Sequence, residues 1–155
     1  MLRLHARGFE VEDTAAIMMR FANGVLGSFL VSDSAASARS WDQTSRENPD
    51  YASADDEDCY LLAGTLGSLA VPTMRLKTFD RPEDRSWCTP MTTAVVAVER
   101  DDPLDRQQAH FCALLRGEVA PLVSARDGLQ NLRVVEAIVQ SVRGGRAVAV
   151  DRPGT

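Results

Sequence analysis

The residues best suited to bind a ligand lie in one polar segment and on one predicted helix. From Asp33 to Asp58 almost no aliphatic side chain is larger than alanine, yet the segment holds aromatic and charged residues. An aromatic platform beside carboxylates and amides suits a hydroxylated ligand, because a buried polar group left unpaired is costly. The candidate ligand-binding residues are Asp33, Arg39, Trp41, Glu47, Asn48, Tyr51 and His110, with Trp87 as a weaker one of the same kind.

Each candidate also has a plain structural interpretation. The polar segment, which we define as Asp33–Asp58, can be a surface loop that two aromatic side chains anchor. Loops beyond roughly 12–15 residues tend to be functional or disordered, and the aromatics favour partial order here. The acidic run Asp55–Asp58 is predicted to be solvated. His110 can simply donate to a backbone carbonyl at the edge of the core.

No arrangement of residues in the sequence predicts a complete catalytic or metal site. The two histidines, His5 and His110, are far apart, and no metal-ligand spacing is found. Gly64–Ser68 lacks the lysine of a phosphate-binding loop and is predicted to be a turn. No G-x-S-x-G sequence surrounds the serines that could be considered as nucleophiles, which are Ser32, Ser34 and Ser37.

Composition limits the classes of partner. The chain of 155 residues has a formal net charge of −5, which disfavours nucleic acid and anionic membranes as partners. No apolar run approaches the roughly 20 residues that cross a bilayer. The three cysteines, Cys59, Cys88 and Cys112, form no C-x-x-C pair, so neither a zinc site nor a disulfide framework is predicted. We expect a cytoplasmic protein with reduced thiols.

A β-hairpin is the clearest structural signal. Asn23-Gly24 separates the apolar runs Thr14–Phe21 and Val25–Ser32, which predicts a type I′ turn with positive φ at both central residues. Large apolar side chains occupy both faces of both strands, whereas a sheet with one solvated face alternates more strictly. The second face is therefore predicted to be covered, either by the same chain or by another subunit.

Strand signals come first along the chain and helix signals come last. Asp102 with Pro103, and Ser124 with Asp127, predict the starts of two helices, which end near Gly117 and at Gly144-Gly145. The other predicted strands are Met1–Arg7, Cys59–Ala63, Leu69–Val71, Met74–Phe79, Met91–Glu99 and a short Ala147–Val150. This order predicts one α+β domain over residues 1–155, with a large, open, mostly antiparallel sheet and helices on one face.

Several motifs resemble one known family when they are taken in order. They are Glu12–Ser28, Gly64–Leu69, Pro103–Phe111, Pro121–Leu129 and Ala137–Val148. Together they are similar to the C-terminal domain of the Gfo/Idh/MocA oxidoreductases, the glucose–fructose oxidoreductase and inositol dehydrogenase family. The resemblance extends from about Phe9 to Val150.

The resemblance implies a domain that shapes the substrate pocket and assembles through its sheet. Full-length members pair it with a Rossmann domain that binds NAD or NADP, and they oxidise or reduce sugars, inositols and related polyols. None of the ten glycines here forms the G-x-G-x-x-G of a dinucleotide site. In the family, a Glu-Lys-Pro motif supplies a lysine near the nicotinamide, and a D-x-x-x-H stretch supplies the acid/base histidine. Both motifs are missing here, and His5 is not assigned the role of the acid/base histidine.

Three functions are therefore compared. The first is the substrate-binding and assembly domain of a polyol dehydrogenase, as a truncated or separately encoded part that binds no cofactor alone. The second is a free-standing, non-catalytic module that binds a small polyol or dimerises. The third is a self-sufficient enzyme, which no constellation of residues supports. A homodimer through the sheet face is expected.

Overall fold

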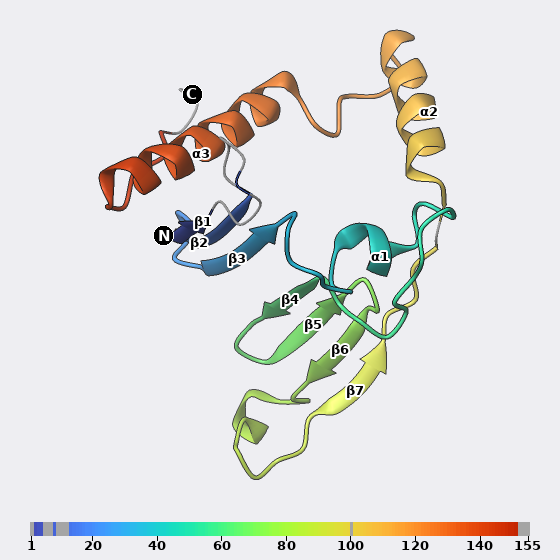
Figure 1. Cartoon of the computed structure of the whole chain (residues 1–155). Coiled ribbons are helices and arrows are strands. Elements are labelled where there is room, and N and C mark those ends of the chain that lie inside the picture. Colours follow the sequence, from blue (N-terminus) through green and yellow to red (C-terminus); the bar gives the residue numbers. More distant parts are fainter. Residues whose placement is uncertain (1, 5–7, 9–12, 100, 152–155) are drawn as a thin grey trace. The chain divides into compact units, whose positions relative to one another are not determined.

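The computed structural model describes residues 2–4, 8, 13–99 and 101–151 (Figure 1). His5 and the ends of the predicted strand Met1–Arg7 lie outside these residues. The chain divides into two compact units. We call Met1–Ala36 with Val119–Thr155 the hairpin unit, and Ser37–Glu118 the four-stranded unit. The expectation of one domain stays a prediction.

The hairpin unit contains a three-stranded antiparallel sheet and the longest helix. The strands follow the order β1-β2-β3, and Ile17 lies opposite Phe29 in the β2–β3 pairing. Val25 and Phe21 lie just outside the two long strands and are joined by a backbone hydrogen bond of 2.8 Å. The elements are β1 (Leu2–Leu4), β2 (Thr14–Arg20), β3 (Leu26–Ser32) and α3 (Ala125–Gly144).

The hairpin is confirmed, but its turn differs from the prediction. Gly24 donates its N–H to the carbonyl of Phe21 at 2.9 Å and has a φ of +89°. Asn23 is not among the residues with positive φ, so the type I′ turn is wrong. A tight turn followed by one left-handed glycine is the usual form of a three-residue hairpin loop. Only Gly24 needs the conformational freedom of glycine here.

One face of the hairpin is uncovered. Met18, Leu26 and Leu30 are 85%, 71% and 89% exposed, and the register places all three on the same face. On the other face Ile17 and Phe29 are half-buried. An ideal Cβ built on Gly27 would lie 3.0 Å from the Phe29 ring, so this face is the better packed one. The described residues of the hairpin unit do not cover the first face.

The four-stranded unit contains a second antiparallel sheet in which the strands lie in chain order, β4-β5-β6-β7 (Figure 1). Gly64 donates to the carbonyl of Gly67 at 2.8 Å, which confirms the predicted turn between β4 and β5. The elements are α1 (Trp41–Ser45), β4 (Tyr60–Ala63), β5 (Gly67–Val71), β6 (Arg75–Thr78), a 3-10 turn η1 (Pro82–Asp84), β7 (Thr92–Val95) and α2 (Pro103–Leu115).

The predicted helix starts are confirmed. The Asp102 carboxylate accepts from the N–H of Leu104 at 2.8 Å, which caps α2. Ser124 and Asp127 form a reciprocal capping box at the start of α3. The hydrogen bonds from Ser124 hold the pKa of Asp127 below its ordinary value. Gly145, with a φ of +62°, ends α3 in the left-handed conformation.

The α+β class is confirmed, and the strands fall into two sheets. The prediction of a last strand at Ala147–Val150 is wrong, because this segment pairs with no strand among those described. Residues 148–151 instead line a cleft with α3. Within the ranges that the structure describes, no helix is both long and apolar enough to cross a membrane.

Candidate functional site

The polar segment contains a short helix that the sequence did not predict. The Ser40 hydroxyl accepts from the N–H of Gln43 at 3.2 Å and caps α1. The Thr44 hydroxyl donates to the carbonyl of Ser40 at 2.8 Å, and the Thr44 side chain is almost completely buried. Ala54 then returns along the helix and donates to the carbonyl of Gln43 at 2.8 Å. The segment is thus folded upon itself.

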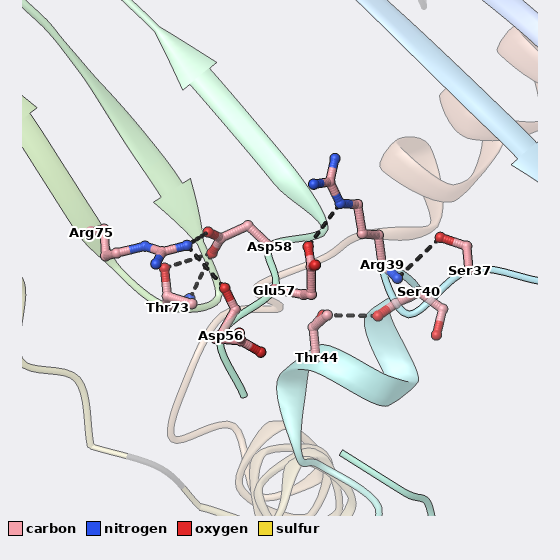
Figure 2. A network of polar contacts seen from close by, with 9 residues as sticks. All are labelled: Ser37, Arg39, Ser40, Thr44, Asp56, Glu57, Asp58, Thr73 and Arg75. Carbon is pink, nitrogen blue, oxygen red and sulfur yellow. Dashed lines mark hydrogen bonds and ion pairs between the residues drawn. The ribbon is translucent and has the colours of Figure 1, made fainter. Parts of the chain in front are cut away.

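Two arginines of the polar segment and one of β6 pair with the acidic run, in which Asp55 and Asp56 are exposed, as predicted, whereas Glu57 and Asp58 are half-buried. Arg39 donates to Glu57 at 2.8 Å, and Arg46 pairs with Asp55. Asp58 accepts from Arg75 of β6 at 2.7 Å (Figure 2). These contacts connect the two ends of the segment to each other and to the sheet.

Asp58 lies at the centre of this network. Its carboxylate accepts from the N–H of Thr73 at 3.0 Å and from the Thr73 hydroxyl at 2.6 Å (Figure 2). Arg75 reaches both this carboxylate and the backbone carbonyl of Asp56, the latter at 3.0 Å. Burial alone raises the pKa of Asp58, but the hydrogen bonds from Thr73 and Arg75 outweigh it and hold the pKa below its ordinary value.

An aromatic pair lies beside the network. The indole N–H of Trp41 donates to Glu47 at 2.8 Å. The Trp41 and Tyr60 rings are tilted by 41° with centroids 5.7 Å apart, a favourable aromatic geometry. The neighbouring Cys59 side chain, followed by burial, raises the pKa of the Tyr60 hydroxyl. Tyr60 therefore stays neutral at physiological pH.

The predicted site residues are distributed over both units. Arg39, Trp41 and Glu47 join the contacts above, and the Asn48 side chain accepts from the N–H of Asp50 at 3.0 Å in a turn. Tyr51 follows in this turn and is 54% exposed. These five candidates and His110, half-buried on α2, belong to the four-stranded unit, whereas Asp33 belongs to the hairpin unit.

The polar segment exposes groups that can hydrogen-bond a ligand, but the described side chains form no catalytic constellation. Tyr51 and the outer edge of Arg39, whose side chain is 71% exposed, remain accessible to a ligand. Trp41 has its N–H and part of its ring surface engaged, so only its remaining surface can contact a ligand. Among the described residues no group of His, Cys, Asp and Glu is placed to hold a metal ion.

Comparison with known protein families shows which family the chain belongs to. Residues 3–150 match the model of the oxidoreductase family, C-terminal alpha/beta domain, of the Gfo/Idh/MocA group. The chain belongs to this family. No match was found among curated proteins or among solved structures.

The described residues of this oxidoreductase domain form no Rossmann-type site for a nicotinamide dinucleotide. A Rossmann site needs a parallel βαβ unit and a glycine-rich turn at the start of its helix. Every strand pairing that the structure describes is antiparallel. No hydride-transfer step therefore follows from the side chains that the structure describes.

Sequence reasoning missed several residues of the network, namely Glu57, Asp58, Tyr60, Thr73 and Arg75. The sequence does contain one signal for these contacts, which is the high density of opposite charges in the polar segment. Arg39 and Arg46 precede the acidic run within the same segment, so they could have been proposed as its partners. The contribution of Arg75 and Thr73 has no such signal, because it depends on how the β5–β6 hairpin folds.

Proposed function

We propose that this domain binds substrate and mediates assembly in an NAD(P)-dependent oxidoreductase that acts on a sugar, an inositol or a related polyol. The match of residues 3–150 to the oxidoreductase C-terminal domain carries the proposal. The dinucleotide belongs to a Rossmann domain outside these residues, since the antiparallel sheets described here offer no cradle for it. The chain alone is not expected to be catalytically complete.

Substrate contact is assigned to the polar segment. Tyr51, Asn48 and the exposed edge of Arg39 present a hydroxyl, an amide and a guanidinium, which can hydrogen-bond the hydroxyl groups of a polyol. The ion pairs of the acidic run hold these groups in a defined backbone conformation, which reduces the ordering cost of binding. His110 stays a candidate on α2.

Assembly is assigned to the open face of the β2–β3 hairpin. Contiguous apolar patches larger than a few hundred square ångströms are rare on monomers, and Met18, Leu26 and Leu30 project from one face without cover. A second copy would bury this face in an isologous homodimer. We also place the protein in the cytoplasm, where Cys59, Cys88 and Cys112, all free in the structure, would stay reduced.

Two measurements test the proposal. The isolated chain, titrated with NADH, should show no micromolar affinity, and the native protein from its source cells should reduce NAD or NADP in the presence of a polyol. Micromolar binding of NADH by the chain alone would contradict the assignment of the cofactor to another domain. A native protein of the mass of this chain, without polyol dehydrogenase activity, would favour a free-standing binding or dimerisation module instead.

A further inference from the structure

Two adjacent methionines of β2 lie on opposite faces of the hairpin sheet. Met18 is 85% exposed, whereas Met19 is half-buried. In the β2–β3 pairing Met18 lies opposite Ser28, and Met19 lies opposite Gly27. Because successive side chains of a strand alternate between faces, Met18 belongs to the open face and Met19 to the better packed one. The strand therefore carries a matched pair of thioethers that differ in their exposure to solvent.

Met18 lies in the middle of the apolar surface to which assembly is assigned. Ser28, directly opposite Met18, has Leu26 and Leu30 two residues away on either side of it, and this spacing keeps all three on one face. The Met18 side chain therefore has a leucine on each diagonal of the strand pair, within reach of a long side chain. A change in the polarity of Met18 would act at the centre of this surface.

Oxidation of the thioether is the reaction that makes such a change. A hydroperoxide transfers one oxygen atom to the sulfur: the S–O bond forms, the O–O bond breaks, and the sulfur loses two electrons while the peroxide is reduced to water or an alcohol. The product is methionine sulfoxide, a polar group that disrupts apolar interfaces. The oxidant must reach the sulfur, so the exposed Met18 should react before the half-buried Met19.

We propose that Met18 is a modification site, oxidised by hydroperoxides in preference to Met19, and that its sulfoxide prevents association through the open face of the hairpin. In a dimer the sulfoxide oxygen would be buried beside leucines that offer it no hydrogen-bond donor, which is unfavourable. An isologous interface contains the sulfoxide twice. The effect on association rests on the proposed function, whereas the preferential oxidation of Met18 does not. A methionine sulfoxide reductase would restore association.

Treatment of the full chain with dilute hydrogen peroxide tests the preference for Met18. A thiol reductant added afterwards would undo reversible oxidation of the cysteines and leave the sulfoxides in place. Tandem mass spectrometry would then follow Met18 and Met19 separately over time. At low protein concentration, where the chain is dissociated, Met18 should be oxidised several-fold faster than Met19, and higher concentration should slow Met18. Equal rates at low concentration, or faster oxidation of Met19, would overturn the proposal.

Sedimentation equilibrium tests the effect on association. Oxidation should raise the dissociation constant by about 30-fold or more, the order expected when each copy buries one polar group without a partner. Met18→Gln, which places a polar side chain of similar length there, should weaken association without peroxide. Met18→Leu should associate equally well before and after peroxide. Met19→Leu is the matched control and should dissociate after peroxide as the wild type does. Circular dichroism would verify that each variant is folded.

The outcomes separate this inference from the proposed assembly. A reduced wild type that stays monomeric would overturn both. A reduced dimer that keeps its mass after Met18 is fully oxidised would overturn the inference and leave the assembly through the hairpin standing. Dissociation by peroxide that persists in Met18→Leu would assign the effect to another residue and would also overturn the inference. Dissociation that is lost in Met18→Leu and kept in Met19→Leu supports it.

Discussion

The β2–β3 hairpin and the polar segment differ in how their side chains find partners. The hairpin is apolar, has an ideal backbone register, and leaves Met18 and Leu30 on one face without contacts that bury them. The polar segment has little regular structure, yet Arg39 and Arg46 pair with acidic residues of the same segment, and Asp58 pairs with Arg75 of β6. In this protein, regular backbone structure therefore does not mean that apolar side chains are buried, and irregular structure does not mean that charged side chains are unpaired. The hairpin leaves one apolar face exposed, whereas the charged groups of the segment find partners within the four-stranded unit.

The largest expected effect concerns the exposed apolar face of the β2–β3 hairpin. Leu30→Lys places a charge in the centre of the proposed interface and should convert the proposed dimer to monomer, or to aggregate if the exposed face is left unprotected. Val123→Lys is the control, since Val123 is 72% exposed and lies outside the strands. Sedimentation equilibrium would measure the mass. An unchanged dimer mass in Leu30→Lys would show that this face is not shared.

The second prediction concerns the network of polar contacts around Asp58. Asp58→Asn should lower the free energy of unfolding by about 1–3 kcal/mol, because hydrogen bonds to a charged group contribute that much and Arg75 loses its partner. Asp56→Asn is a close control. Asp56 contributes its backbone carbonyl to Arg75, and the substitution keeps that carbonyl. Urea unfolding would compare the two variants, and equal losses would contradict a specific role for the Asp58 carboxylate.

How far the sequence predicted these regions follows from the range of the interactions. The hairpin and the caps at Asp102 and Ser124 were predicted, because turns and caps depend on residues close in sequence. The five-residue helix α1 is too short to show a periodic pattern. The Arg39–Glu57 and Arg75–Asp58 pairs join residues 18 and 17 positions apart. Such contacts depend on the tertiary fold, and no local pattern specifies them.

The third prediction concerns how the free energy of unfolding depends on pH through Asp58. The folded state lowers the pKa of Asp58, so its contribution to stability is present above its ordinary pKa of about 3.9 and is lost as the pH falls through the lower, folded value. The wild type should therefore lose more stability than Asp58→Asn between neutral pH and about pH 3. Asp127, whose pKa is also lowered, titrates in both proteins and cancels in the comparison. Parallel urea midpoints across this range would show that Asp58 is not linked to folding.

The smallest expected effect compares one left-handed residue from each region. Gly24→Ala in the hairpin turn forces an alanine to a φ of +89° and should cost about 1 kcal/mol, although space for its Cβ is open. Arg46→Gly, at a φ of +60°, relieves similar strain in the polar segment.

Arg46→Gly also removes the exposed pair with Asp55, which contributes about 0–1 kcal/mol. The two terms should nearly cancel, so that stability changes by less than about 0.5 kcal/mol. Native-state hydrogen exchange would measure the hairpin and the segment separately. A large loss in Arg46→Gly would show that the Arg46–Asp55 pair holds the segment, and that its ion pairs are worth more than ordinary surface pairs.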